Sequence, residues 1–411
     1  MKIAVIGGGA AGLMAAASAR ETNPDAEIFV IEKNDGLGKK VIISGGGRCN
    51  LTTGIHDIRT LRTKYPRGGA FLSSALFAFP PEAIVDWFES HGVPLKEEAD
   101  ARVFPCSDDG KDIVGVFETF FRENNVRVWL HSSVERIEKN HSGFSIHLKD
   151  GNKPLIVDRI ILTTGGQAYR QTGSTGDGYA FAVALGHTIT PLAPSLSSFE
   201  TREPWPADVS GLSFTNARIS ANTPPGTNAS GPFLFTHKGV SGPAIFALSS
   251  LIAFETIDRT HPVKIFIDLF PEETTEQLRT RIDEAIKEMP KKQSENMLAL
   301  IVSKSLAHVA VHETSVESKR ANELSKQETL AIASWLKRIP LHVIGRGTGD
   351  EFVTAGGVDL KEVNPKTMES LICPGLFFAG EILNIDGFTG GFNLTASWAT
   401  GHDAGAHAAQ D

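Results

Sequence analysis

The sequence predicts an α/β protein in which a parallel-sheet domain is interrupted by a β-rich region and a helical region. Three observations predict it. A glycine-rich turn follows an apolar run at the N-terminus, a second such turn lies near the C-terminus, and the expected secondary structure changes twice between them. The length of 411 residues is typical of two or three domains. We expect one domain from residues 1–190 and 351–411, a β-rich barrel-like domain from 191–271 and 339–350, and a helical domain from 272–338.

The N-terminal segment has the order of a dinucleotide-binding unit. The apolar run KIAVI leads into GGGAAG, an Ala-rich helical segment follows, and a second run, EIFVI, ends at Glu32. In this GxGxxG pattern Gly7 makes a tight turn, Gly9 lets a pyrophosphate approach the backbone, and Gly12 lets the helix pack on the strand. The helix N-terminus attracts phosphate, and Glu32, about 20 residues further on, suits an adenosine ribose. This Rossmann-type segment therefore predicts the cofactor residues Gly7, Gly9, Ala10, Ala11, Gly12 and Glu32.

The remainder of the chain favours FAD over NAD as the bound cofactor. A long glycine-rich segment follows Glu32, where a dehydrogenase would continue to alternate strands and helices. Near the C-terminus, LFFAG predicts a strand that ends at the acid Glu381, and a glycine turn leads to a helix that begins near Gly391. Such a helix N-terminus can stabilise negative charge on the pyrimidine side of a flavin. The strand RIILTTGG ends at Gly165 and Gly166, a turn that would close over the adenine and pyrophosphate.

The motifs KKVIISGGGRCNLT, LTTGGQAYRQTGSTGDGY, FTHKGVSGPAIF, TAGGV and GEILNIDGFTGGFNL resemble those of the BaiN/RdsA-type NAD(P)/FAD-dependent oxidoreductases, also called the aminoacetone oxidase family. The resemblance runs in order along the whole chain. It implies FAD in a two-dinucleotide-binding Rossmann domain with an inserted β-rich and a helical domain. Thr53 and Asn384 depart from the family pattern. The resemblance implies these further cofactor residues: Lys33, Lys40, Ser44, Gly45, Gly47, Arg48, Cys49, Asn50, Gly380, Glu381, Gly391, Phe392, Asn393 and Leu394.

The block SGGGRCN, residues 44–50, combines three glycines with an ion, a thiol and an amide. Glycines allow backbone N–H groups to lie against a cofactor, Arg48 could pair with phosphate or with the charge of reduced flavin, and Asn50 could bond the ring edge. Cys49 has two interpretations. A buried, inert thiol is the common fate of a free cysteine, and a catalytic proton donor or redox partner requires a pKa lowered by Arg48.

Composition excludes some classes of protein. A formal net charge of −8 argues against nucleic-acid binding by bulk charge. Three scattered cysteines without a CxxC motif argue against a disulfide framework or a zinc site, so we expect no bound metal. No signal peptide or apolar membrane span is visible, so we expect a cytoplasmic protein. His308 and His312 share a helix face but lack the glutamate of HExxH. The oligomeric state stays open.

The charge is unevenly distributed along the chain. Residues 38–67 carry seven Lys or Arg against one acid, and residues 351–411 carry eight acids against two lysines. The basic stretch could contact a polyanion such as ribosomal RNA, or it could be balanced by the acidic tail.

The sequence thus predicts an oxidoreductase that passes hydride through flavin N5, with NAD(P)H as a transient electron donor. Its substrate would be a C=C bond, such as that of uridine reduced to dihydrouridine in ribosomal RNA. The alternatives are an enone reductase or amine oxidase acting on a small molecule, and a flavin-binding sensor without turnover.

Overall fold

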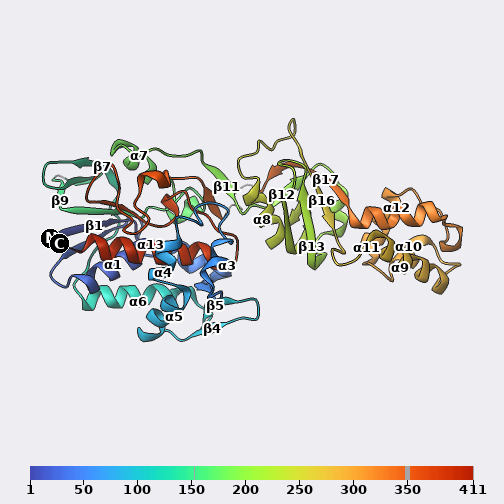
Figure 1. Cartoon of the computed structure of the whole chain (residues 1–411), viewed down its shortest axis with the longest axis horizontal. Helices are drawn as coiled ribbons and strands as arrows, with labels where there is room; N and C mark the ends of the chain where they lie inside the picture. Colours follow the sequence, from blue (N-terminus) through green and yellow to red (C-terminus); the bar gives the residue numbers. More distant parts are fainter. Residues whose placement is uncertain (152, 348–351, 411) are drawn as a thin grey trace. The chain divides into compact units, whose positions relative to one another are not determined.

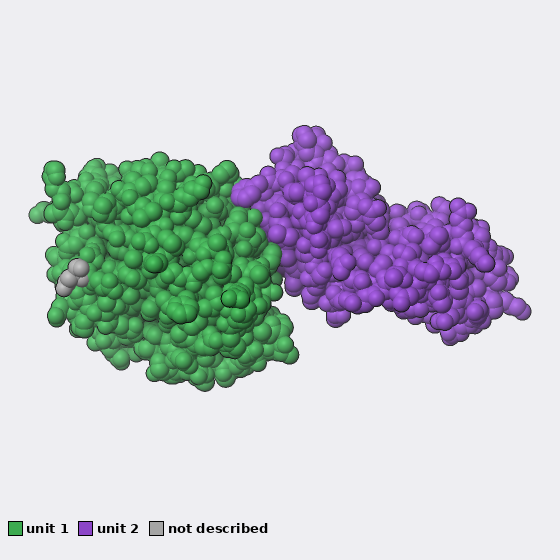
Figure 2. All heavy atoms as spheres, viewed as in Figure 1, with its two compact units in different colours: residues 1–195, 351–411 green, residues 196–350 purple. Residues whose placement is uncertain are grey.

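The computed structural model describes residues 1–151, 153–347 and 352–410. The chain folds into two compact units, residues 1–195 with 351–411 and residues 196–350 (Figure 2). The first boundary falls after residue 195, where the sequence predicted 190, because strand β11 (Ala193–Ser195) pairs with β18 (Val353–Ala355) inside the first unit. The second predicted boundary, between residues 350 and 351, lies outside the described residues.

The first unit is built on a five-stranded sheet in the order β19-β10-β1-β2-β6 (Figure 1). Every neighbouring pair in this sheet is parallel. Its strands read as apolar runs because both faces of a parallel sheet are normally covered. The strands are β1 Lys2–Ile6, β2 Glu27–Ile31, β6 Arg127–Trp129, β10 Arg159–Leu162 and β19 Leu376–Phe378.

Helices α1, α6 and α13 pack against this sheet, and α1 and α13 lie side by side (Figure 1). Shorter helices surround the segments that connect the strands. The α-helices of this unit are α1 Ala10–Thr22, α2 Lys39–Ile43, α3 Ile58–Arg62, α4 Ser73–Ala78, α5 Pro81–Ser90, α6 Gly110–Glu123, α7 Asp177–Ala184 and α13 Phe392–Ala408. The 3-10 turns are η1 Ser44–Gly47, η2 Arg170–Thr172, η5 Leu360–Glu362 and η6 Gly380–Ile382.

Besides the antiparallel pair β11–β18, the described part of the first unit contains two three-stranded antiparallel sheets. One is a meander of β7, β8 and β9, and the other contains β3, β5 and β4 and follows the glycine-rich block. Their bounds are β7 Val134–Lys139, β8 Phe144–Leu148, β9 Leu155–Val157, β3 Thr52–Thr53, β4 Leu95–Glu97 and β5 Arg102–Pro105.

The second unit contains a closed barrel of six strands in the order β12-β15-β14-β13-β16-β17. Buried residues of the barrel, such as Phe235 and Ile267, and of the helices, such as Leu278 and Leu336, form one apolar core. The strands are β12 Phe199–Thr201, β13 Ser213–Ala221, β14 Asn228–Thr236, β15 Gly239–Ser241, β16 Val263–Asp268 and β17 Ile339–Arg346. The helices are η3 Trp205–Val209, α8 Pro243–Leu251, α9 Thr275–Glu288, α10 Ser294–Leu298, α11 Lys304–Glu313, η4 Ala321–Glu323 and α12 Lys326–Lys337.

The predicted fold class is confirmed: a Rossmann-type parallel sheet carries an inserted β-barrel and a helical segment. The separation of residues 272–338 as a domain of their own stays a prediction. Within the described residues, no helix is long and apolar enough to cross a membrane.

Candidate functional site

Three glycine turns meet at one edge of the parallel sheet. Gly7 follows β1, Gly165 follows β10 and Gly380 follows β19. The carboxyl ends of parallel strands lie at the same edge, which is where open α/β sheets bind ligands. The candidate site is therefore built where the sheet, α1 and α13 meet.

The first turn has the geometry that the GxGxxG spacing predicts. Gly7 has φ +108°, and a Cβ there would lie 2.6 Å from the carbonyl oxygen of Thr163. A Cβ on Gly12 would lie 1.9 Å from the carbonyl oxygen of Gly7. At Gly9, in contrast, no atom lies within 4 Å of the position of a Cβ, and α1 begins there without a side-chain cap. The structure thus leaves open space and free N–H groups where a pyrophosphate would approach the backbone.

The acid at the end of β2 is held by backbone donors. Glu32 accepts hydrogen bonds from the N–H of Gly8 at 2.7 Å and of Asn34 at 2.8 Å. This carboxylate is buried beside the glycine turn, and its contact with a ribose stays a prediction. Lys33, expected at the adenosine end, directs its ammonium to Asp177 at 2.6 Å.

Helices α1 and α13 run parallel and are offset along their axes. A Cβ on Gly401 would lie 2.4 Å from the carbonyl oxygen of Ala11, and a Cβ on Gly405 would lie 2.2 Å from that of Ala15. Both helices thus advance by the same number of residues between the two contacts. Since α13 begins at Phe392, well before Gly401, its N-terminus extends about 12 Å beyond that of α1 at 1.5 Å per residue. The two helix N-termini, each partially positive, therefore point in the same direction and are displaced from one another along the helix axes.

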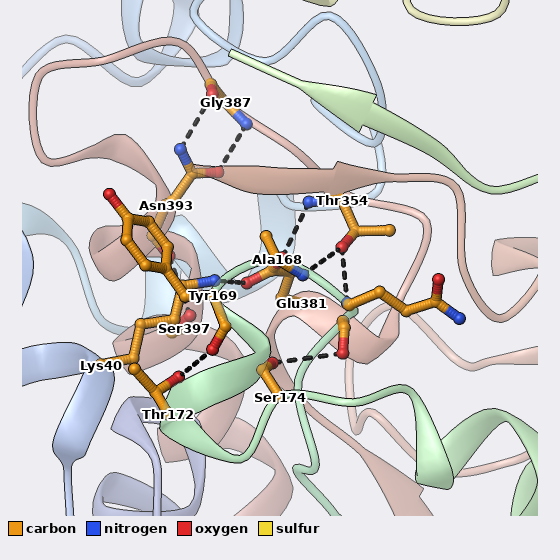
Figure 3. A network of polar contacts seen from close by, with 12 residues as sticks. Lys40, Ala168, Tyr169, Thr172, Ser174, Thr354, Glu381, Gly387, Asn393 and Ser397 are labelled. Atoms are coloured by element: carbon orange, nitrogen blue, oxygen red, sulfur yellow. Dashed lines mark hydrogen bonds and ion pairs between the residues drawn. The ribbon is translucent and has the colours of Figure 1, made fainter. Parts of the chain in front are cut away.

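Glu381 joins the strand-end segments through a polar network (Figure 3). Its carboxylate accepts from Lys40 Nζ at 2.7 Å and from the backbone N–H of Thr354 at 2.8 Å. The Thr354 hydroxyl accepts hydrogen bonds from the backbone N–H groups of Gln167 at 2.7 Å and of Ala168 at 3.2 Å, in the turn after Gly166. A Cβ on Gly166 would lie 2.4 Å from this hydroxyl oxygen, so the turn requires glycine. A Cβ on Gly380, where φ is +77°, would lie 2.7 Å from α1.

Helix α13 is preceded by its N-cap residue Gly391, which has φ +86° and forms no side-chain hydrogen bond to the helix. A Cβ there would lie 2.4 Å from the carbonyl oxygen of Thr52. In the amide orientation that satisfies both groups, Asn50 accepts from the N–H of Gly391 at 3.0 Å and donates to Thr52 O at 3.3 Å. Asn50 therefore ties the glycine-rich block to the start of α13.

The first turn of α13 is held from two sides. The Tyr65 hydroxyl donates to the carbonyl oxygen of Phe392 at 2.8 Å. The Asn393 amide accepts from the N–H of Gly387 at 2.8 Å and donates to its carbonyl oxygen at 2.9 Å (Figure 3). Leu394 is partly buried against the apolar core. The side chain of Asn393 is thus used within the chain, which leaves the backbone N–H groups of this turn as the donors that a ligand could use.

The glycine-rich block forms an exposed turn beside this helix. Gly45, Gly46 and Gly47 have φ values of +58°, +74° and +90°, which favour glycine. A Cβ on Gly45 would lie 2.8 Å from the backbone nitrogen of Asn50, while nothing lies within 4 Å of one on Gly46 or Gly47. Ser44 donates to the carbonyl oxygen of Val41 at 2.7 Å. The backbone of this turn is therefore accessible to a ligand.

Arg48 is engaged by acids of the chain itself. Its guanidinium contacts Glu98 at 2.6 Å and Asp108 at 2.7 Å, and it stacks on the ring of Phe104 at 4.0 Å. The hydrogen bonds to these carboxylates raise the pKa of Arg48. Arg48 thus anchors the glycine-rich turn through Glu98 and Asp108, and its contact with phosphate or flavin stays a prediction.

Cys49 does not meet the condition set for a catalytic thiol. Its side chain is fully buried, and burial raises its pKa to about 12, while a hydrogen bond with Ser44 acts in the opposite direction. A buried thiolate lacks the solvation that a charged group needs, so Cys49 is a neutral thiol at physiological pH. The lowered pKa that a catalytic Cys49 requires is not found, which favours the interpretation of a buried, inert thiol.

The basic stretch of residues 38–67 is largely neutralised by carboxylates. Lys40 and Arg67 pair with acids of the C-terminal segment, Glu381 and Asp386. Lys39 pairs with the nearby Asp35, and Arg48 pairs with Glu98 and Asp108, which lie 50 and 60 residues further along the chain. Of the two interpretations offered by the sequence, balance by the acidic tail accounts for two of the seven cations.

Four residues that the sequence did not single out complete the site: Tyr65, Arg67, Thr354 and Asp386. Thr354 lies in the TAGGV motif and Asp386 in the segment before the C-terminal glycines. The opposite charges of the two chain segments were a signal for the Arg67–Asp386 pair, but a charge excess does not indicate which partners meet.

His308 and His312, on α11, lie near Glu295 (3.2 Å) and Glu313 (4.0 Å).

Residues 1–407 match the family model described as "HI0933-like protein Rossmann domain", and the chain belongs to this family. It is 30% identical to a 3-dehydro-bile acid delta(4,6)-reductase of Clostridium scindens, over 100% of this chain and 99% of that protein. It is 27% identical to a ribosomal RNA dihydrouridine synthase of Escherichia coli, over 96% and 95% of the two chains.

Solved structures of other proteins share the fold. A 3-ketosteroid-Δ4-(5α)-dehydrogenase from Rhodococcus jostii, in complex with 4-androstene-3,17-dione, is 16% identical with a TM-score of 0.53, covering 100% of this chain and 96% of that one. A 3-ketosteroid Δ1-dehydrogenase from Sterolibacterium denitrificans is 12% identical with a TM-score of 0.52, covering 99% of each chain. These structures show the shared fold, while the family and the 30% identical reductase identify the chain as an FAD-dependent oxidoreductase.

Proposed function

We propose that this chain is a reductase that adds hydride to a C=C bond conjugated with a carbonyl group. The observation that carries the proposal is the pair of parallel helices, whose uncapped N-termini are offset by about 12 Å. One N-terminus suits the pyrophosphate of FAD, and the other suits the pyrimidine side of its ring. When bound, FAD supplies the hydride at N5.

The residues of this chain bind and orient the cofactor. The turn at Gly9 would receive the pyrophosphate, and Glu32 would accept hydrogen bonds from the adenosine ribose. Glu381, held in place by Lys40 and Thr354, would accept from ribityl hydroxyls. Backbone N–H groups of the first turn of α13 would face the ring where negative charge accumulates on reduction.

The substrate class is a conjugated C=C bond because two relatives bear names that describe such reductions, one of a 3-dehydro-bile acid and one of uridine in RNA. A small-molecule enone is favoured over RNA. The electrostatic reason for an RNA partner was the basic stretch of residues 38–67, and four of its seven cations pair with acids of the chain. Uridine in ribosomal RNA is the second candidate, and it is supported by the name of the 27% identical relative.

The test is an anaerobic titration of the purified, FAD-loaded protein. NADPH, and NADH in parallel, should bleach the visible flavin band, because a reductase needs an electron donor. The reduced protein is then mixed with a 3-oxo-Δ4 steroid acid or with an unmodified ribosomal RNA transcript. Return of the colour with the steroid acid, together with the saturated product by mass spectrometry, would support the enone assignment, and return with RNA and formation of dihydrouridine would support the second candidate.

Three outcomes would contradict the proposal. A protein that cannot be loaded with FAD would remove its basis. A flavin that an amine bleaches without NAD(P)H would indicate an amine oxidase. A flavin that no donor bleaches would indicate the sensor without turnover.

A further inference from the structure

An ion pair joins the end of β2 to a glycine-rich segment, residues 170–177. Lys33, which directly follows Glu32, places Nζ 2.6 Å from a carboxylate oxygen of Asp177. The same ammonium donates to the Thr175 hydroxyl at 2.6 Å, and this hydroxyl donates to Asp177. The side chains of Lys33 and Asp177 are 28% and 45% exposed, so water and salt reach the pair. The pair can therefore open while the domain stays folded.

A second contact joins the next residue of the chain to the same segment. Asn34 Nδ2 donates to the carbonyl oxygen of Thr172 at 2.9 Å. A Cβ on Gly173, where φ is +95°, would lie 2.4 Å from this amide nitrogen. The backbone of the segment thus approaches the side chain of Asn34 closely.

Other polar contacts of the segment stay within its own part of the chain. The Ser174 hydroxyl, for example, donates to the carbonyl oxygen of Gly166 at 3.2 Å (Figure 3). Within the described residues, the hydrogen bonds and ion pairs that link residues 170–177 to the chain beyond residues 166–184 come from the two residues after Glu32. Loss of these contacts would therefore release the segment and leave the parallel sheet intact.

Both contacts lie beside the acid proposed to bind the adenosine ribose. Glu32 accepts hydrogen bonds from the N–H groups of Gly8 and Asn34. We infer that Lys33 and Asn34 act as a clasp: they hold residues 170–177 beside Glu32, and FAD is released when the clasp opens. This inference rests on the proposed function, because the retained group is the FAD that Glu32 would bind.

Lys33 acts through Asp177 and is a positioning residue. Because release requires the open clasp, the dissociation rate of FAD rises with the fraction of molecules in which the clasp is open. Lys33→Gln and Asp177→Asn should therefore each accelerate release, by about two- to fivefold for a partly exposed pair. The double variant should be no faster than the faster single variant, because both changes remove the same contact. Lys33→Arg keeps a cation for Asp177 and should release FAD near the wild-type rate.

Ionic strength supplies a second readout. Salt screens an exposed pair, so release from the wild-type protein should accelerate as the ionic strength rises, and this acceleration should be smaller in Lys33→Gln. Lys39→Gln is the matched control. It removes a nearby cation that pairs with Asp35 and is 37% exposed, so it should keep both the wild-type release rate and its salt dependence.

The experiment dilutes FAD-loaded protein and measures the flavin that remains bound, by rapid gel filtration at successive times. A lysine that binds a phosphate directly gives a different result. Lys33→Gln would then accelerate release, whereas Asp177→Asn would free the lysine for the phosphate and slow release. Such opposite effects would overturn the inference, and so would release at the wild-type rate in both variants.

Asn34→Ala covers the case in which the charge variants disturb the start of α7. It removes a neutral hydrogen bond to the segment, so it should accelerate release about two- to tenfold and keep the wild-type salt dependence. The wild-type release rate in folded Asn34→Ala would overturn the inference. Failure of the proposed function is distinguishable from failure of the clasp: in the first case the wild-type protein binds no FAD, and in the second it binds FAD and the variants release it at the wild-type rate.

Discussion

Replacement of Gly9 by alanine is expected to separate cofactor binding from folding. A Cβ at this position meets no atom within 4 Å, and φ −83° with ψ −173° is an extended conformation open to any residue. The protein without cofactor should therefore fold as the wild type does. The methyl group would, however, occupy the space through which a pyrophosphate approaches the backbone.

The magnitude follows from the hydrogen bonds that the methyl group would prevent. A hydrogen bond to a charged group contributes about 1.5–3 kcal/mol. Loss of one such bond between the α1 N-terminus and a phosphate therefore weakens FAD binding by about 10- to 150-fold, at about 1.4 kcal/mol for each factor of ten. The stabilisation that added FAD confers should fall with the logarithm of the affinity, by about 1.4 kcal/mol for each tenfold loss when FAD is in excess over Kd.

The assay is a titration of cofactor-free protein with FAD, followed by flavin fluorescence, with a thermal melt of the same samples. Gly115→Ala is the matched control: no atom lies within 4 Å of its Cβ either, and it lies on α6 away from the glycine turn. Gly12→Ala is the opposite control, because its Cβ would lie 1.9 Å from a carbonyl oxygen and should destabilise the fold itself. Wild-type FAD affinity in folded Gly9→Ala would refute the assignment of this turn.

Three further predictions test the fold and the buried groups. Gly405→Ala should destabilise the protein by about 1–3 kcal/mol in a chemical denaturation, since its Cβ would lie 2.2 Å from a carbonyl oxygen of α1, whereas Gly115→Ala should not destabilise it. An alkylating reagent at pH 8 should label the exposed Cys106 and spare Cys49, whose pKa is raised to about 12; labelling of Cys49 in the native protein would contradict its burial. Burial also lowers the pKa of His187, so as the pH falls the unfolded chain binds this proton before the folded chain does. The free energy of unfolding should therefore fall as the pH drops below about 6.5. In thermal melts, His187→Gln should lose less stability than the wild type below this pH, and an equal loss would exclude this histidine as a cause.

Local pattern was sufficient for the glycine turns. Gly7, Gly9 and Gly12 each have a distinct environment in the structure, and the spacing of the three residues predicts each one. The reason is physical: a strand, a tight turn and a helix that follow one another in sequence constrain the backbone locally, so a short motif carries the whole geometry. The inserted barrel was likewise visible as short strands between turn residues.

Side chains at residues 38–67 required the tertiary structure. The sequence shows cations and a thiol close together, which left open a contact of Arg48 with phosphate or flavin and two interpretations of Cys49. In the folded chain Arg48 meets Glu98 and Asp108, and Cys49 is buried. Which acid meets which cation depends on long-range packing, and so does the solvent exposure that controls a pKa.

By itself the sequence determined the family, the parallel sheet and the place of the dinucleotide turn, because these depend on local backbone geometry and on apolar runs. Only the tertiary structure decided that α1 and α13 run parallel with their N-termini offset, and that Asp386 is paired inside the protein with Arg67. Both features join segments more than 300 residues apart, and no spacing within either segment could specify them.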